Sequence, residues 1–398
     1  MQKTSETLQK RNPLNYFLTY SICFISLGLG AASLGPLLPS LADTTNTSLG
    51  QISFLFTASS LGYMAGSAGG GRLYDRFNGH KLMILALVLI VLTNVFIPFL
   101  PSFYLLLIAM FLAGFGSGAV DIGGNVNLMW VFGSDVGTYM NGMHFCFGLG
   151  AFISPMLIHG VMKLSGGALT WPYWTLAIAF TPGIVGLWLL KAPDNPEKAQ
   201  ETIPSGRANN ILVLLMMVLF FLYVGIEGGF GGWIFSYVTE TDVATETAAS
   251  FMNSIFWGAL TLGRLISIPL AKKLKPSKLL IGNFSLAIIS LGLILIWPVN
   301  TFVVWAVSIG FGFALSSVFP TLMALSESRM KVTGKVTSMF FLGVSMGGIV
   351  MPMVLGQIFD YIGSYHIMVT LFATTCLGLI VLFSVLFASN RAGEKKRG

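Results

Sequence analysis

Twelve long apolar stretches follow one another along the chain, and they restrict the fold more than any other feature. Each is long enough for a helix to cross about 30 Å of hydrocarbon. Only 9% of the residues are charged, against about 25% in a soluble domain. We therefore predict an all-α integral membrane protein with twelve transmembrane helices. The expected spans are residues 14–38, 50–71, 80–99, 103–131, 138–162, 172–190, 210–238, 247–271, 278–298, 301–325, 335–359 and 365–388.

The basic residues orient these spans. With the N-terminus placed in the cytoplasm, every lysine and arginine except Lys163 and Arg264 falls on the cytoplasmic side. This is the positive-inside distribution of membrane proteins. We therefore expect a multi-pass protein of the cell membrane with both termini cytoplasmic. The net charge of +7 indicates contact with the lipid bilayer rather than with nucleic acid.

A polar segment divides the chain into related halves. Residues 192–209 are rich in proline and charge, which is typical of a linker. They separate an N-terminal six-helix half, 1–191, from a C-terminal six-helix half, 210–398. With a shift of 197 residues, Gly66 aligns with Gly263 and Lys81 with Lys278. The repeat predicts two pseudo-symmetric six-helix bundles with a central site between them.

The loop after the second span carries a motif. Its sequence, Gly71-Arg72-Leu73-Tyr74-Asp75-Arg76, resembles the corresponding loop motif of the major facilitator superfamily. The resemblance implies the major facilitator fold and a conformational switch at Gly71, Asp75 and Arg76. Arg264, in the repeat of this loop, is assigned to the same switch. Its alternatives are an ion partner for a buried acid and a side chain that extends to the membrane surface.

Four further stretches resemble a subgroup of this superfamily. They are similar to fucose permease-like proteins, and most similar to the sodium-dependent glucose transporter 1 type. The stretches are residues 121–126, 144–151, 223–237 and 317–321. The resemblance implies cation-coupled sugar transport, with an acid of the fourth helix serving the coupling. Fucose permease-like proteins also carry an acid in the first helix, where this chain has none before Asp43.

Asp121 and Glu227 are acids inside apolar spans. A carboxylate at membrane depth costs roughly 2.5–3.5 kcal/mol on insertion scales, so intramembrane acids usually serve function. Asn125 lies one helical turn after Asp121 on the same face. An acid and an amide together are suited to a cation, with Na⁺ at Asp121 as one option, or to sugar hydroxyls. The alternative is a structural carboxylate paired to a neighbouring helix. Both acids are predicted to couple transport to Na⁺ or H⁺.

Other polar and aromatic residues are candidates for the substrate site. Trp233, after the glycine-rich stretch around Glu227, is a possible sugar platform or a core tryptophan. For His144 three roles are open: it accepts a proton, contacts the substrate, or is a hydrogen-bonded histidine of the core. Asn253 and Trp257, one turn apart, are expected to line the same cavity. The glycines at 114, 116 and 118 resemble part of a nucleotide motif, but helix packing explains them better.

The sequence favours a secondary active transporter of a small, hexose-like sugar, working by alternating access as a cation symporter. The alternative is a proton-driven exporter of amphipathic compounds, whose pocket would use the 32 phenylalanines and 19 methionines. An enzyme is not expected, because the sequence has no nucleophile–base spacing or metal cluster. No cofactor is predicted beyond the coupling ion, and we expect a monomer.

Overall fold

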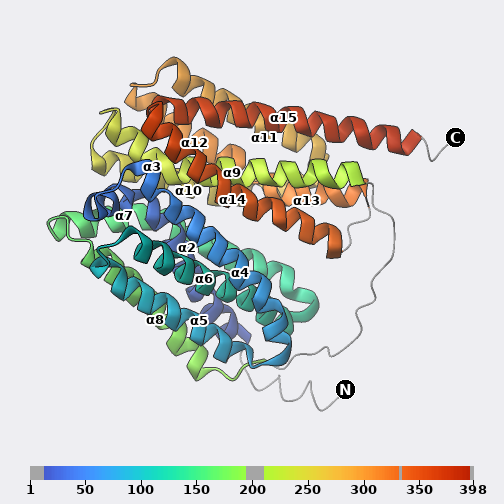
Figure 1. The fold of residues 1–398 in the computed structure, drawn as a ribbon. Helices are drawn as coiled ribbons and strands as arrows, with labels where there is room; N and C mark the ends of the chain where they lie inside the picture. The colour runs from blue at the N-terminus through green and yellow to red at the C-terminus, as the bar shows by residue number, and fades with distance from the viewer. Residues whose placement is uncertain (1–12, 194–209, 331–333, 395–398) are drawn as a thin grey trace, which may run out of the picture.

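The computed structural model describes residues 13–193, 210–330 and 334–394. Every regular element in these ranges is a helix (Figure 1). The first half contains α2 (Pro13–Thr45), α3 (Leu49–Ile52), α4 (Phe54–Arg76), α5 (Gly79–Phe96), α6 (Phe103–Phe132), α7 (Val136–Leu164) and α8 (Thr170–Leu189), with short 3-10 turns η1 (Ile97–Phe99) and η2 (Gly133–Asp135). The second half contains α9 (Asn210–Glu240), α10 (Glu246–Lys273), α11 (Pro276–Ile296), α12 (Thr301–Leu315), α13 (Val318–Arg329), α14 (Gly334–Tyr361) and α15 (Tyr365–Glu394).

The predicted spans match these helices with two differences. Among the described residues, eleven helices are long and apolar enough to cross a membrane, counting Thr301–Arg329 as one. The twelfth expected span, 50–71, is divided at Ser53 into α3 and α4. Its glycines, serines and the charges near Arg76 lower its hydropathy below that of the other spans. The expected span 301–325 is also interrupted, at Ser316 and Ser317, between α12 and α13.

The same packing pattern occurs in both halves. In the first half, α2 packs on α7, α4 on α6, and α5 on α8. In the second half, α9 packs on α14, α10 on α12, and α11 on α15. Figure 1 shows the blue-to-green helices as one bundle and the yellow-to-red helices as the other. The predicted two-bundle fold is therefore confirmed. Residues 194–209 of the expected linker lie outside the described ranges, so its boundaries stay a prediction.

Glycines bring α4 and α6 into backbone contact. A Cβ added at Gly62 or Gly66 would collide with the carbonyl of Phe111 or Phe115. A Cβ at Gly114 would collide with the carbonyl of Ser59. Small residues at such crossings are how membrane helices approach closely. The close crossing places α4 directly beside the polar residues of α6, as the packing interpretation of Gly114 predicted.

The two bundles touch at one end of the molecule, which we call the contact end. Here the Gly50 N–H donates to Asp360 Oδ1 at 2.9 Å, and Gln357 Nε2 donates to the Gly50 carbonyl at 3.1 Å. Near the same end, His159 Nε2 and Thr247 Oγ1 lie 2.8 Å apart. In Figure 1, α4 and α14 lie close together near α3 and diverge toward the side that carries both termini.

Candidate functional site

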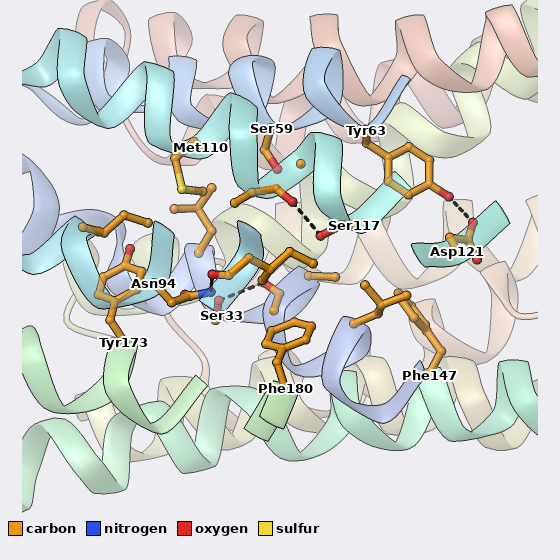
Figure 2. A pocket seen from close by; sticks show the side chains of 18 of the residues that line it. Ser33, Ser59, Tyr63, Asn94, Met110, Ser117, Asp121, Phe147, Tyr173 and Phe180 are labelled. Carbon is orange, nitrogen blue, oxygen red and sulfur yellow. Dashed lines mark hydrogen bonds between the residues drawn. The ribbon is translucent and has the colours of Figure 1, made fainter. Parts of the chain in front are cut away.

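A cavity of about 450 Å³ lies inside the first bundle and reaches the second. This volume is within the usual range of small-molecule sites. Figure 2 shows Tyr63 and Asp121 at one end of it and Asn94 and Tyr173 at the other. The polar and charged residues in its wall are Ser33, Ser59, Tyr63, Asn94, Ser117, Asp121, His144, Tyr173, Glu227 and Arg264.

Asp121 is the centre of a hydrogen-bonded group in the first bundle. The Tyr63 hydroxyl donates to Asp121 Oδ2. Asn125 Nδ2 donates to the Asp121 carbonyl at 2.9 Å and to Oδ1 at 3.2 Å. His144 Nε2 lies 3.2 Å from Asn125 Oδ1, and because that oxygen only accepts, Nε2 carries the proton in this contact. The structure therefore brings the predicted residues Asp121, Asn125 and His144 together.

Glu227 has a different environment in the second bundle. Its carboxylate interacts with the charge of Arg264 and with the hydroxyl of Tyr223. Glu227 Oε2 is nevertheless buried without a hydrogen-bond partner. Arg264 lines the central cavity with Glu227. Arg264 is half-buried and near enough to Glu227 for the two charges to interact. Its role, as an ion partner for a buried acid or as a side chain that extends to the membrane surface, stays a prediction.

The two acids that the sequence assigned to coupling have separate surroundings. Both line the cavity, but each has partners from its own bundle. The partners of Asp121 are a phenol, an amide and an imidazole, none of which carries a permanent charge. Glu227 instead faces a guanidinium. Of the two acids, Asp121 is therefore the one whose partners carry no permanent charge.

Two of the predicted substrate residues lie elsewhere. Trp233 is fully buried against Phe359, with ring centroids 5.4 Å apart, and it lines none of the cavities described here. Six residues correspond to about 1.7 helical turns, so Trp233 points roughly 120° away from Glu227. Asn253 is also fully buried, and both of its side-chain polar atoms are without partners. In this conformation neither side chain faces a cavity described here, so their contact with a substrate stays a prediction.

Trp257 does line a cavity. It borders a small space of about 170 Å³ together with Glu227, Gly228 and Gly231. Its indole Nε1 is buried without a partner. Of the two tryptophans singled out by sequence, Trp257 is thus the one that faces open space.

The predicted switch residues are only partly described. Arg76 is exposed at the end of α4. The side-chain surroundings of Gly71 and Asp75 lie outside the described residues. Their role, and that of Arg76, stays a prediction.

Sequence reasoning missed the aromatic hydroxyls of the site. Tyr63 and Tyr223 each contact one of the two acids, and Asn94 and Tyr173 close the far end of the cavity. The sequence feature that could have indicated Tyr63 is the neighbouring glycine pair, Gly62 and Gly66. Glycines four residues apart mark a close helix crossing, and Tyr63 is adjacent to that face.

A second, larger cavity of about 610 Å³ continues from the central one. The two share His144, Val224, Glu227 and Arg264. The larger cavity extends to Leu274 and Pro276, at the turn between α10 and α11. That turn lies at the end opposite to the contact end.

Two helical bundles and a charged cavity lined by residues of both define the class of membrane transporters with alternating halves. The sequence profile of the Major Facilitator Superfamily matches residues 20–352, so the chain belongs to this family. Its members are transporters, not enzymes.

Similar proteins are consistent with this assignment. The human sodium-dependent glucose transporter 1 is 29% identical over 370 residues, covering 84% of this chain and 71% of the relative. The mouse major facilitator superfamily domain-containing protein 4A is 26% identical, covering 97% and 94%. A D-xylose-proton symporter has the same fold, with a TM-score of 0.78, 13% identity, and coverage of 94% and 97%.

Proposed function

We propose that this protein is a secondary active transporter of a hexose-like sugar, coupled to the movement of Na⁺ or H⁺ in the same direction. The observation that carries the proposal is the position of Asp121. Its carboxylate lies in the wall of the central cavity with partners that have no permanent charge. The similarity to sodium-dependent glucose transporters supports both a sugar and a cation.

Asp121 is proposed as the coupling site, and Glu227 is moved from the coupling role to the substrate side. A cation at Asp121 would neutralise a charge that no fixed cation balances. Loaded and empty carriers then differ in the free energy needed to close the cavity, and this difference supplies the coupling. Asn125 and His144 are proposed to contact the sugar beside the ion. The carboxylate of Glu227, by contrast, already interacts with the positive charge of Arg264.

We infer the stage of the transport cycle from the position of the contact end. With the orientation that the basic residues predict, the contact end faces outside and the larger cavity opens toward the cytoplasm. The conformation would then be the inward-facing one. Rocking of the bundles would separate the residues of the contact end and close the opposite end around the turn between α10 and α11.

Reconstituted liposomes provide the test. We expect labelled D-glucose to accumulate when a Na⁺ or proton gradient is imposed, with each gradient applied separately. The Asp121→Asn variant should lose accumulation and keep exchange of labelled for unlabelled sugar. Accumulation that is unchanged in Asp121→Asn would remove Asp121 from the coupling. Gradient-driven efflux of amphipathic dyes without any sugar uptake would favour the exporter instead.

A further inference from the structure

A side cavity of about 170 Å³ lies next to the central cavity. The two have Ala31, Val224 and Glu227 in common, so a group that extends past Glu227 enters the side cavity. One water molecule occupies about 30 Å³ of liquid volume. The side cavity therefore has enough space for a short substituent.

Two unsatisfied polar atoms belong to residues in its wall. Glu227 Oε2 and Trp257 Nε1 are both buried and have no hydrogen-bond partner. The first is an acceptor and the second a donor. Buried polar groups without partners are unfavourable, so a ligand that satisfies both is bound selectively. A hydroxyl group meets both requirements, because it donates to the carboxylate and accepts from the indole.

Glycines form part of the remaining wall. Gly228 and Gly231 of α9 line it, together with Gly35 of α2. A Cβ added at Gly228 would meet no heavy atom within 4 Å, which shows open space in front of this residue. At Gly231, by contrast, an added Cβ would collide with the indole of Trp257. The opening beside Gly228 therefore suits a methylene group that carries the hydroxyl.

We propose that the side cavity binds the hydroxymethyl arm of a hexopyranose, with the arm's hydroxyl bridging Glu227 Oε2 and Trp257 Nε1. The ring then stays in the central cavity beside Asp121. This inference rests on the proposed function and adds to it a choice of hexoses over pentoses. D-Xylose is the matched probe, since it is D-glucose without the arm, and 6-deoxy-D-glucose keeps the arm's carbon but lacks its hydroxyl.

Competition against labelled D-glucose binding tests the proposal on the full-length protein. The wild type should bind D-glucose at least about tenfold more tightly than either probe, as expected for a hydroxyl hydrogen-bonded to a charged group. Trp257→Phe should weaken D-glucose but not 6-deoxy-D-glucose. Gly228→Ala places a methyl group in the opening and should reduce the preference for D-glucose over D-xylose to within about threefold.

Gly282→Ala is the control, because its added Cβ also meets nothing within 4 Å and Gly282 lines neither the side cavity nor the central one. It should keep the wild-type profile. Equal binding of the three sugars by the wild type would overturn the proposal, and so would an unchanged preference in Gly228→Ala. Those outcomes leave sugar transport intact. Failure of all three sugars to bind would instead remove the proposed function and this inference with it.

Discussion

The hydroxyl of Ser60 on α4 donates to the carbonyl of Gly348 on α14, 3.1 Å away, and so joins the two bundles. Pro352 makes this acceptor available. Proline has no N–H, so the helical hydrogen bond that Gly348 would receive from residue 352 is missing. Three residues before Ser60 in α4, the hydroxyl of Thr57 donates to the carbonyl of Ile349, next to Gly348, at 2.9 Å. A helix defect in one bundle is thus the hydrogen-bonding site for the other.

Removal of the Ser60 hydroxyl should loosen the contact end. One hydrogen bond contributes about 0.5–1.5 kcal/mol, so Ser60→Ala is expected to raise the ratio of separated to closed contact ends about two- to tenfold. Spin labels at the exposed residues Thr44 and Ile362, with the native cysteines replaced, would measure the distance distribution. Ser384→Ala, which removes an exposed hydroxyl on α15, serves as the control. Identical distributions for Ser60→Ala and the wild type would contradict the prediction.

Tyr63→Phe should change how tightly the coupling ion binds. The Tyr63 hydroxyl now donates to Asp121, so its loss leaves the carboxylate more available to a cation. Hydrogen bonds to charged groups contribute about 1.5–3 kcal/mol, so we expect the half-maximal Na⁺ or H⁺ concentration for uptake to fall at least tenfold. Uptake measured against cation concentration in liposomes checks this. A rise in that concentration would instead make the hydroxyl a ligand of the ion.

The sequence predicted most of the fold because hydropathy and charge act locally. Apolar length determined the spans, and basic loops predicted their direction. The interruption at Ser316 and Ser317 was missed, because two serines do not break an otherwise apolar stretch. Asp121, Asn125 and His144 were grouped correctly because two of them share one helix face. The sequence could not indicate that Trp233 faces away from the cavity, because its direction depends on the rotation of α9 relative to the cavity.

The sequence did not indicate that Arg264 lies in the same cavity wall as Glu227. Arg264 lies about two turns from Lys272, so its sequence context suggested the membrane surface. Only the packing of α10 on α9 places it beside Glu227. Long side chains reach different partners from the same backbone position, and local sequence does not decide between them.

Removal of Arg264 should destabilise the folded protein. Arg264 and Glu227 are half-buried and their charges interact, so removing one leaves the other less well compensated. The loss should be smaller than the about 3–5 kcal/mol typical of a fully buried pair. Arg264→Ala should therefore unfold at a lower temperature in detergent, while Arg264→Ala combined with Glu227→Gln should recover much of the loss. Arg76→Ala, at an exposed position, is the control. Equal melting temperatures for the single and double variants would show that the pair does not support the fold.

Gly114→Ala should separate α4 from α6 and disturb Asp121. The added methyl group would collide with the carbonyl of Ser59, and backbone cannot move aside as a flexible side chain can. Overpacking of this kind costs typically about 1–3 kcal/mol. Gly160→Ala is a matched control in α7, since its Cβ meets nothing within 4 Å. Alanine also has the higher helix propensity, so the control should be as stable as the wild type or slightly more stable.

Melting temperatures report the packing, and the cation dependence of uptake reports the Tyr63–Asp121 contact. Because Tyr63 reaches Asp121 only across this close crossing, both measurements should change in Gly114→Ala and neither in Gly160→Ala. A loss of stability with normal cation dependence would show that the hydrogen bond to Asp121 does not depend on the glycine crossing.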